Sequence, residues 1–285
     1  MEYGADISFV NLGITIDHLR SSFTVFGFRI AFYAIIIVAG MAAGIWVAQS
    51  DARRRGQDPE LYLDFALYAI AFSIIGARIY YVVFAWDNYK DDIWQIFNIR
   101  AGGLAIYGGI IAGVITLAVF SKIKKISFFS MADTGVLGLI TGQIIGRWGN
   151  FFNSEAFGGY TDGLFAMRIR RALVNESMIS QELIDHLVID RGVEYIQVHP
   201  TFLYESLWNL GVLAFMLWYR KRKKFDGEMM WIYLLGYGIG RSWIEGLRTD
   251  QLILGTTGIP VSQALSVLLA AVSAGMIFWG YRRHN

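Results

Sequence analysis

Seven apolar segments of 19 to 25 residues occupy most of this 285-residue chain. A helix of about 20 apolar residues is long enough to cross the hydrocarbon core of a bilayer, so each segment predicts one transmembrane helix. We therefore expect an all-α polytopic membrane protein, a single integral membrane domain over residues 1–285, with a small mixed extracytoplasmic head at 147–199. The predicted spans are 30–48, 61–85, 102–120, 128–146, 201–219, 228–247 and 259–280.

The composition excludes several classes of protein. Hydrophobic residues make up 55% and charged residues 17%, whereas a soluble domain carries about 25% charged residues. Because the chain has no cysteine, disulfides, thiolate metal sites, iron–sulfur clusters and catalysis by an enzyme thiol are excluded. Four histidines without an HExxH pattern give little support for a zinc hydrolase. A net charge of +2 does not favour nucleic acid as a partner.

The distribution of basic residues predicts the orientation. Thirteen lysines and arginines fall in the connections on one side of the seven spans and four in the short segments on the other. Basic connections stay in the cytoplasm, which places the N-terminus outside and the C-terminus in the cytoplasm. The first 24 residues lack the basic segment of a cleavable signal peptide. Within the head, residues from Ser180 predict a short capped helix and Val193–Val198 alternate like a strand.

The sixth span carries polar residues on a single face. Tyr237, Arg241, Glu245 and Arg248 are spaced by 4, 4 and 3 residues, which places them along one side of a helix. Charged groups inside a membrane are costly and are candidates for function. An Arg–Glu pair that locks two helices together is the structural alternative for Glu245. One glutamate cannot neutralise two arginines, whereas a bound phosphate could.

A second polar cluster follows the fourth span. Arginine and asparagine donors suit a phosphate or an anionic lipid headgroup. The structural alternative is an interfacial loop anchored by Trp148 and a snorkelling Arg147. The candidate residues are Arg147, Asn150, Glu155 and Gly158.

Further candidates are weaker when taken alone. Gly138, Gly142 and Gly146 form a stripe at which another helix can approach closely. Tyr107 lies between two glycine pairs, and Glu205 follows His199-Pro200 where a partner arginine is expected. We interpret three charged residues in or near spans as members of structural pairs: Asp64, Arg78 and Asp133.

Taken in order, these motifs resemble those of the bacterial prolipoprotein diacylglyceryl transferase family over essentially the whole chain. No single short match carries the resemblance, which rests on six motifs in order. They are Arg29–Tyr33, Gly76–Tyr81, Gly102–Gly109, Gly146–Gly158, His199–Glu205 and Tyr237–Asp250.

The resemblance implies the first step of bacterial lipoprotein maturation in the cytoplasmic (inner) membrane. The family transfers the diacylglyceryl group of phosphatidylglycerol to the lipobox cysteine thiol of a prolipoprotein signal peptide, releases glycerol 1-phosphate and needs no metal or nucleotide. By position, the implied phosphatidylglycerol-binding residues are Arg147, Asn150, Glu155, Gly158, Arg248 and Tyr33, and the implied catalytic residues are Tyr107, Arg241, Tyr237 and Glu245. Tyr107 stands where many members carry a histidine proposed as the base. This leaves two roles open for Tyr107: it orients the lipid, or it relays a proton while Arg241 favours the thiolate.

The polar residues fit this chemistry independently. Attack of a thiolate on a glycerol carbon expels a phosphate monoester, and preorganised arginines stabilise the negative charge that gathers there. The main alternative is a secondary transporter for an anionic solute that uses Arg147, Arg241 and Arg248. That class predicts repeated halves with broken helices, and the sequence shows no internal repeat. A cysteine-dependent acyltransferase is excluded by the absence of cysteine, and no GxS motif beside a membrane histidine supports a serine protease.

Overall fold

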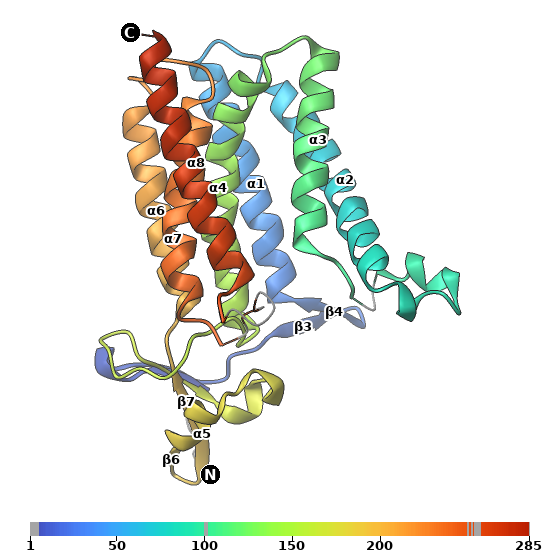
Figure 1. Cartoon of the computed structure of the whole chain (residues 1–285). Helices are drawn as coiled ribbons and strands as arrows, with labels where there is room; N and C mark the ends of the chain where they lie inside the picture. The colour runs from blue at the N-terminus through green and yellow to red at the C-terminus, as the bar shows by residue number, and fades with distance from the viewer. Residues whose placement is uncertain (1–5, 100–101, 250, 252, 254–257, 285) are drawn as a thin grey trace. The chain divides into compact units, whose positions relative to one another are not determined.

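The computed structural model describes residues 6–99, 102–249, 251, 253 and 258–284 of a multi-pass membrane protein. Within these residues, five helices are long and apolar enough to cross a membrane (Figure 1). They are α1 (Phe32–Arg54), α2 (Glu60–Phe84), α3 (Ile106–Lys124), α4 (Phe128–Phe152) and α8 (Val261–His284). The chain divides into two compact units, one formed by Met1–Gly44 with Leu137–Asn285 and the other by Ile45–Val136.

Two further long helices, α6 (Thr201–Tyr219) and α7 (Glu228–Glu245), occupy the other two predicted ranges. They do not reach the apolarity of the five, because buried polar residues such as Glu205, Asn209 and Glu245 lie along them. In the first unit, α7 packs against both α6 and α8 (Figure 1). The structure thus gives a mostly helical protein whose most polar long helices lie next to each other.

The end of α4 differs from the expected range. The helix continues to Phe152 instead of ending near 146, so Arg147 and Asn150 lie on its last turns and not in a loop. The physical reason is apolar burial, since Phe151 belongs to the hydrophobic core formed with the small sheet. Helix α3, by contrast, begins only at Ile106, because Gly102 and Gly103 both have positive φ angles that an α-helix excludes.

The glycine stripe of α4 packs against α1, as expected for close helix contact. A Cβ atom built on Gly44 would lie 2.5 Å from the carbonyl oxygen of Gly138, and one built on Gly40 would lie 3.1 Å from that of Gly142. The two backbones can therefore approach this closely only because these positions carry no side chain.

We expect Gly44→Ala to lower the melting temperature of the detergent-solubilised protein. Overpacking of this kind costs about 1–3 kcal/mol, because the added methyl group would meet backbone that cannot rotate away. Gly135→Ala is the matched control, since its Cβ would meet no neighbouring heavy atom of the described residues within 4 Å. Alanine also favours a helix over glycine by about 1 kcal/mol, so the control should melt at an equal or higher temperature. An equal fall in melting temperature in both variants would contradict the close packing of Gly44 against Gly138.

A small antiparallel sheet, with strand order β2-β1-β5-β7-β6, forms the rest of the first unit. Its core contains Ile7, Ile169, Ile196 and Phe202. The predicted strand at Val193–Val198 and the short helix capped by Ser180 are confirmed as β7 and α5 (Gln181–Asp185), whereas the sequence did not predict the N-terminal strands. The other strands are β1 (Ile7–Phe9), β2 (Ile14–Ile16), β5 (Met167–Arg170) and β6 (Val188–Asp190), and a separate hairpin pairs β3 (Ser22–Val25) with β4 (Phe28–Ala31). Short 3-10 helices lie at Val10–Leu12, Trp86–Asn88, Ile93–Phe97, Arg171–Leu173 and Glu176–Met178.

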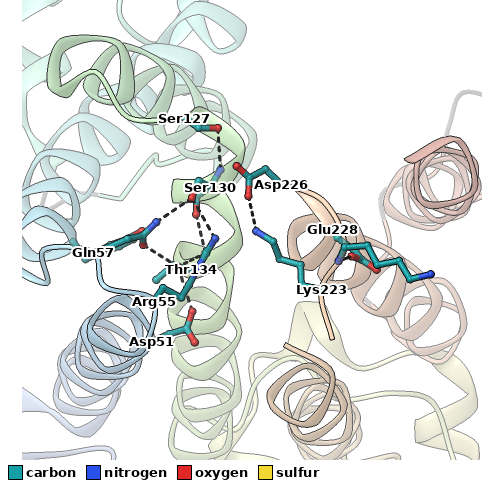
Figure 2. Close-up of polar contacts among 11 residues, drawn as sticks. Asp51, Arg55, Gln57, Ser127, Ser130, Thr134, Lys223, Asp226 and Glu228 are labelled. Atoms are coloured by element: carbon teal, nitrogen blue, oxygen red, sulfur yellow. Dashed lines mark hydrogen bonds and ion pairs between the residues drawn. The ribbon is translucent and has the colours of Figure 1, made fainter. Parts of the chain in front are cut away.

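In the second unit, polar side chains tie helix ends and loops together. Figure 2 shows Arg55, which donates to the carbonyl oxygen of Ser130 at 3.1 Å and to Thr134 Oγ1 at 2.7 Å, while Gln57 donates to Ser130 Oγ at 3.0 Å. Asp64 forms the expected pair with Lys124, at 3.6 Å. These contacts are structural and stabilise the connections between the long helices.

Arg78 is structural as expected, and its hydrogen-bond partners among the described residues are backbone carbonyl groups instead of one paired side chain. Its buried guanidinium donates to backbone carbonyl oxygens and lies over the ring of Tyr89. Backbone acceptors can satisfy the guanidinium because several carbonyl groups of the segment before α3 point toward it. The acceptors belong to Gln95, Ile96, Asn98, Gly102 and Gly103.

Candidate active site

Glu205, on the first turns of α6, contacts three arginines from different parts of the first unit. Its Oε2 lies 2.5 Å from Arg147 Nη2 on α4, and its Oε1 accepts a hydrogen bond of 2.8 Å from Arg241 Nη1 on α7. Arg248 Nη1, just beyond the end of α7, lies 3.7 Å from the same Oε1. Glu245, one turn after Arg241 on α7, forms a second ion pair with Arg241. We call these five residues the arginine cluster.

The arginine cluster is shielded from solvent and carries more positive than negative charge. The side chains of Arg147, Arg241 and Arg248 are 24%, 15% and 11% exposed, and those of Glu205 and Glu245 are 5% and 4% exposed. Three guanidinium groups and two carboxylates thus lie together in the arginine cluster. Guanidinium groups bind phosphate through paired hydrogen bonds, and burial makes such contacts stronger than they are in water.

The prediction that one glutamate faces Arg241 and Arg248 was incomplete. Glu205 provides the second carboxylate, which comes from α6, far from both arginines in sequence. Glu245 pairs with Arg241 on the same helix, so this ion pair does not itself join two helices. Glu205 joins α6 to α4 and α7.

Tyr237 lies one turn before Arg241 on α7 and stacks on Tyr233, with ring centroids 5.9 Å apart. The Tyr233 hydroxyl accepts a hydrogen bond of 2.9 Å from Gln143 Nε2 on α4. Sequence reasoning missed Gln143 and Tyr233. The spacing could have found them, since each lies four residues before a residue that was singled out, Arg147 or Tyr237.

The segment after α4 orders itself through Glu155. Glu155 Oε1 accepts hydrogen bonds from Asn150 at 3.1 Å and from Asn153 at 3.2 Å. These contacts close a tight turn in which Ser154 and Ala156 have positive φ angles. The structure therefore brings Asn150 and Glu155 together beside the Arg147 turn of α4.

Gly158 lies where two backbones meet. It donates its N–H to the carbonyl oxygen of His199 at 2.9 Å, and Gly159 donates to that of Leu247, also at 2.9 Å. A Cβ on Gly158 would lie 2.6 Å from the Leu247 carbonyl oxygen. The glycine thus holds the segment that carries Arg248 against the start of α6.

The remaining sequence candidates lie in different surroundings. Tyr33 packs against α4, because a Cβ on Gly149 would lie 2.7 Å from its ring. Partial burial lowers the pKa of His199, although Glu182 acts in the opposite direction, so its imidazole is neutral at neutral pH. Tyr107 lies on the first turn of α3, in the second unit. Among the described residues, no group of three or more His, Asp or Glu side chains is placed to hold a metal ion.

These features define a class: a multi-pass membrane protein with a buried cluster of arginines and glutamates between helices of its larger unit. Residues 20–279 match the family described as prolipoprotein diacylglyceryl transferase, and the chain belongs to this family.

Named relatives agree. The chain is 42% identical over 258 residues to the phosphatidylglycerol–prolipoprotein diacylglyceryl transferase of Clostridioides difficile, covering 90% of this chain and 93% of the relative. It is 43% identical to the same transferase of Listeria innocua (89% and 86% covered) and 40% identical to that of Thermosynechococcus vestitus (88% and 87% covered).

Proposed function

We propose that this chain is a transferase that moves the diacylglyceryl group of phosphatidylglycerol to the lipobox cysteine thiol of prolipoprotein signal peptides, the first step of lipoprotein maturation. Its relatives carry the corresponding name. The observation that carries the proposal for the site is the arginine cluster, which brings three guanidinium groups together in a largely buried position. Both substrates are presented at a bilayer, which a multi-pass membrane protein can reach directly.

In the proposed reaction, the substrate thiolate attacks the carbon of the diacylated glycerol that is bonded to the phosphate oxygen. A carbon–sulfur bond forms and the carbon–oxygen bond to phosphate breaks, so that glycerol 1-phosphate leaves with the electron pair. The leaving phosphate gathers negative charge, which a fixed guanidinium stabilises. We assign this role to Arg241, because Glu205 and Glu245 hold it from two sides.

The other residues are proposed to bind and orient the lipid. Arg147 and Arg248 hold the headgroup phosphate, with Asn150 and Glu155 shaping the adjoining turn. Gly158 keeps the Arg248 segment in place. Tyr33 and Tyr237 line the helix faces beside Gly149 and Arg241, and Tyr107 orients the lipid or relays the thiol proton.

The activity is tested with purified protein, phosphatidylglycerol and a synthetic lipobox peptide, followed by mass spectrometry of the peptide. We expect a mass gain equal to one diacylglyceryl group. With phosphatidylethanolamine as the only lipid, the rate should fall at least tenfold, because its headgroup cancels much of the phosphate charge that the arginines bind. Equal rates with both lipids would contradict the headgroup role of Arg147. No mass gain, where a relative is active, would contradict the function.

The seven-span topology is likewise a proposal, with the N-terminus outside and the C-terminus inside the bacterial cytoplasmic membrane. It is supported by the 13-to-4 bias of basic residues between the two sets of connections. A reporter fused after Asn285 should be cytoplasmic, and one inserted near Asn175 should be external. The reverse result at either site would contradict the orientation.

A further inference from the structure

The polar surface formed by α4 and α7 extends past the arginine cluster into the helix bundle. Gln143 precedes Arg147 by one helical turn on α4, and Tyr233 precedes Arg241 by two turns on α7. Phe151, one turn beyond Arg147, belongs to the core of the sheet. The Gln143–Tyr233 pair therefore lies on the side of the arginine cluster that faces away from the sheet, with Gln143 about 6 Å of helix rise from Arg147 along α4.

The pair is not satisfied by its own hydrogen bond. Gln143 Nε2 donates to the Tyr233 hydroxyl at 2.9 Å, while Gln143 Oε1 is buried and has no hydrogen-bond partner among the described residues. Turning the amide over would let the Tyr233 hydroxyl donate to Oε1 and would leave the amide N–H groups without a partner. In either orientation one polar group of the pair needs a third partner, and the hydrocarbon core of a bilayer offers no water to provide it.

The proposed donor lipid carries a suitable group at this position. In phosphatidylglycerol only the glycerol backbone separates the phosphate from the two ester groups, and the acyl chains continue from there toward the bilayer centre. When the phosphate lies in the arginine cluster, an ester carbonyl oxygen therefore lies a glycerol backbone away from it, on the side of Gln143. This oxygen is a hydrogen-bond acceptor.

We propose that Gln143, oriented by Tyr233, donates a hydrogen bond to an ester carbonyl oxygen of the donor lipid and so selects diacyl lipids. This inference rests on the proposed transferase function and extends it from the headgroup to the acyl linkage. With lipid bound, Tyr233 donates to Gln143 Oε1 and Gln143 Nε2 donates to the lipid, so every polar group of the pair has a partner.

The test compares diacyl phosphatidylglycerol with dialkyl-ether phosphatidylglycerol of the same chain length, which lacks carbonyl groups. Transfer to a lipobox peptide is measured in mixed micelles at several lipid fractions. We expect the wild type to prefer the diacyl lipid by about tenfold in kcat/KM, the effect of one buried hydrogen bond. Gln143→Leu should lose that preference by slowing only the diacyl reaction, and Tyr233→Phe should change the ratio in the same direction.

Thr141→Val is the matched control on the same helix. The Thr141 hydroxyl donates to the carbonyl oxygen of Leu137 within α4, so its removal should leave both rates unchanged. An equal loss on both lipids in Gln143→Leu, or no loss on the diacyl lipid, would overturn the inference. If Gln143→Leu does not fold, as judged by its melting temperature, Tyr233→Phe decides by the same ratio. A wild type that is inactive with both lipids would instead contradict the proposed function.

Discussion

Arg241→Ala is expected to lower turnover at saturating phosphatidylglycerol by a factor of about 10²–10³, the usual cost of losing one contact to a charge that develops in the transition state. Arg241 is bound by Glu205 and by Glu245, and two carboxylates restrict its guanidinium to one position. A group fixed in this way does not have to reorganise when the phosphate leaves. Arg241→Lys should recover only part of the rate, because an ammonium group lacks the planar pair of donors.

Arg147→Ala provides the comparison. Among the described residues, Arg147 forms an ion pair with Glu205 only, and it is more exposed than Arg241, which suits a group that captures the headgroup. We expect its loss to raise KM for phosphatidylglycerol more than it lowers kcat. Steady-state kinetics at several lipid fractions separate the two roles. Full turnover of Arg241→Ala at high lipid would make Arg241 a binding residue and remove the proposed difference.

Glu205→Gln should cause the largest loss of stability, because the variant removes the carboxylate that contacts all three arginines. Breaking a buried ion pair by removing one partner costs about 3–5 kcal/mol, and we expect a lower melting temperature together with a severe loss of transfer. Glu245→Gln is the matched control, since Glu245 forms an ion pair with no described residue except Arg241, and it should destabilise less.

Added anionic lipid tests whether the lost negative charge causes the lower melting temperature of Glu205→Gln. Phosphatidylglycerol vesicles should raise the melting temperature of Glu205→Gln by more than that of the wild type, because phosphate replaces the missing negative charge. An unchanged melting temperature in Glu205→Gln without lipid would show that Glu205 does not hold the arginines together.

The helices were predictable because a bilayer permits few alternatives: an apolar segment of about 20 residues must satisfy its own backbone. The local spacing on α7 also placed Tyr237, Arg241 and Glu245 on one face. The role of Glu205 was only partly predictable. Its position at the start of α6 indicated an arginine partner, but the number of partners depends on how α4, α6 and α7 pack.

The short N-terminal strands could not be predicted for a similar reason. Ile7–Phe9 and Ile14–Ile16 are three residues each, too short to show an alternating pattern. Their formation depends on β5, which pairs Ile7 with Ile169 from a distant part of the chain. The end of α4 likewise depended on a distant partner, since Phe151 extends the helix by packing in the sheet core.

That packing makes the sheet a support that sets the spacing between Arg147 and Glu205. Phe151 lies one turn from Arg147 and Phe202 one turn from Glu205, their rings pack against each other at 5.2 Å, and both belong to the sheet core. The sheet therefore helps to position the arginine cluster, although it contributes no residue to it. A cut within the sheet is expected to disrupt the contact between Arg147 and Glu205 while leaving α4 and α6 themselves uncut.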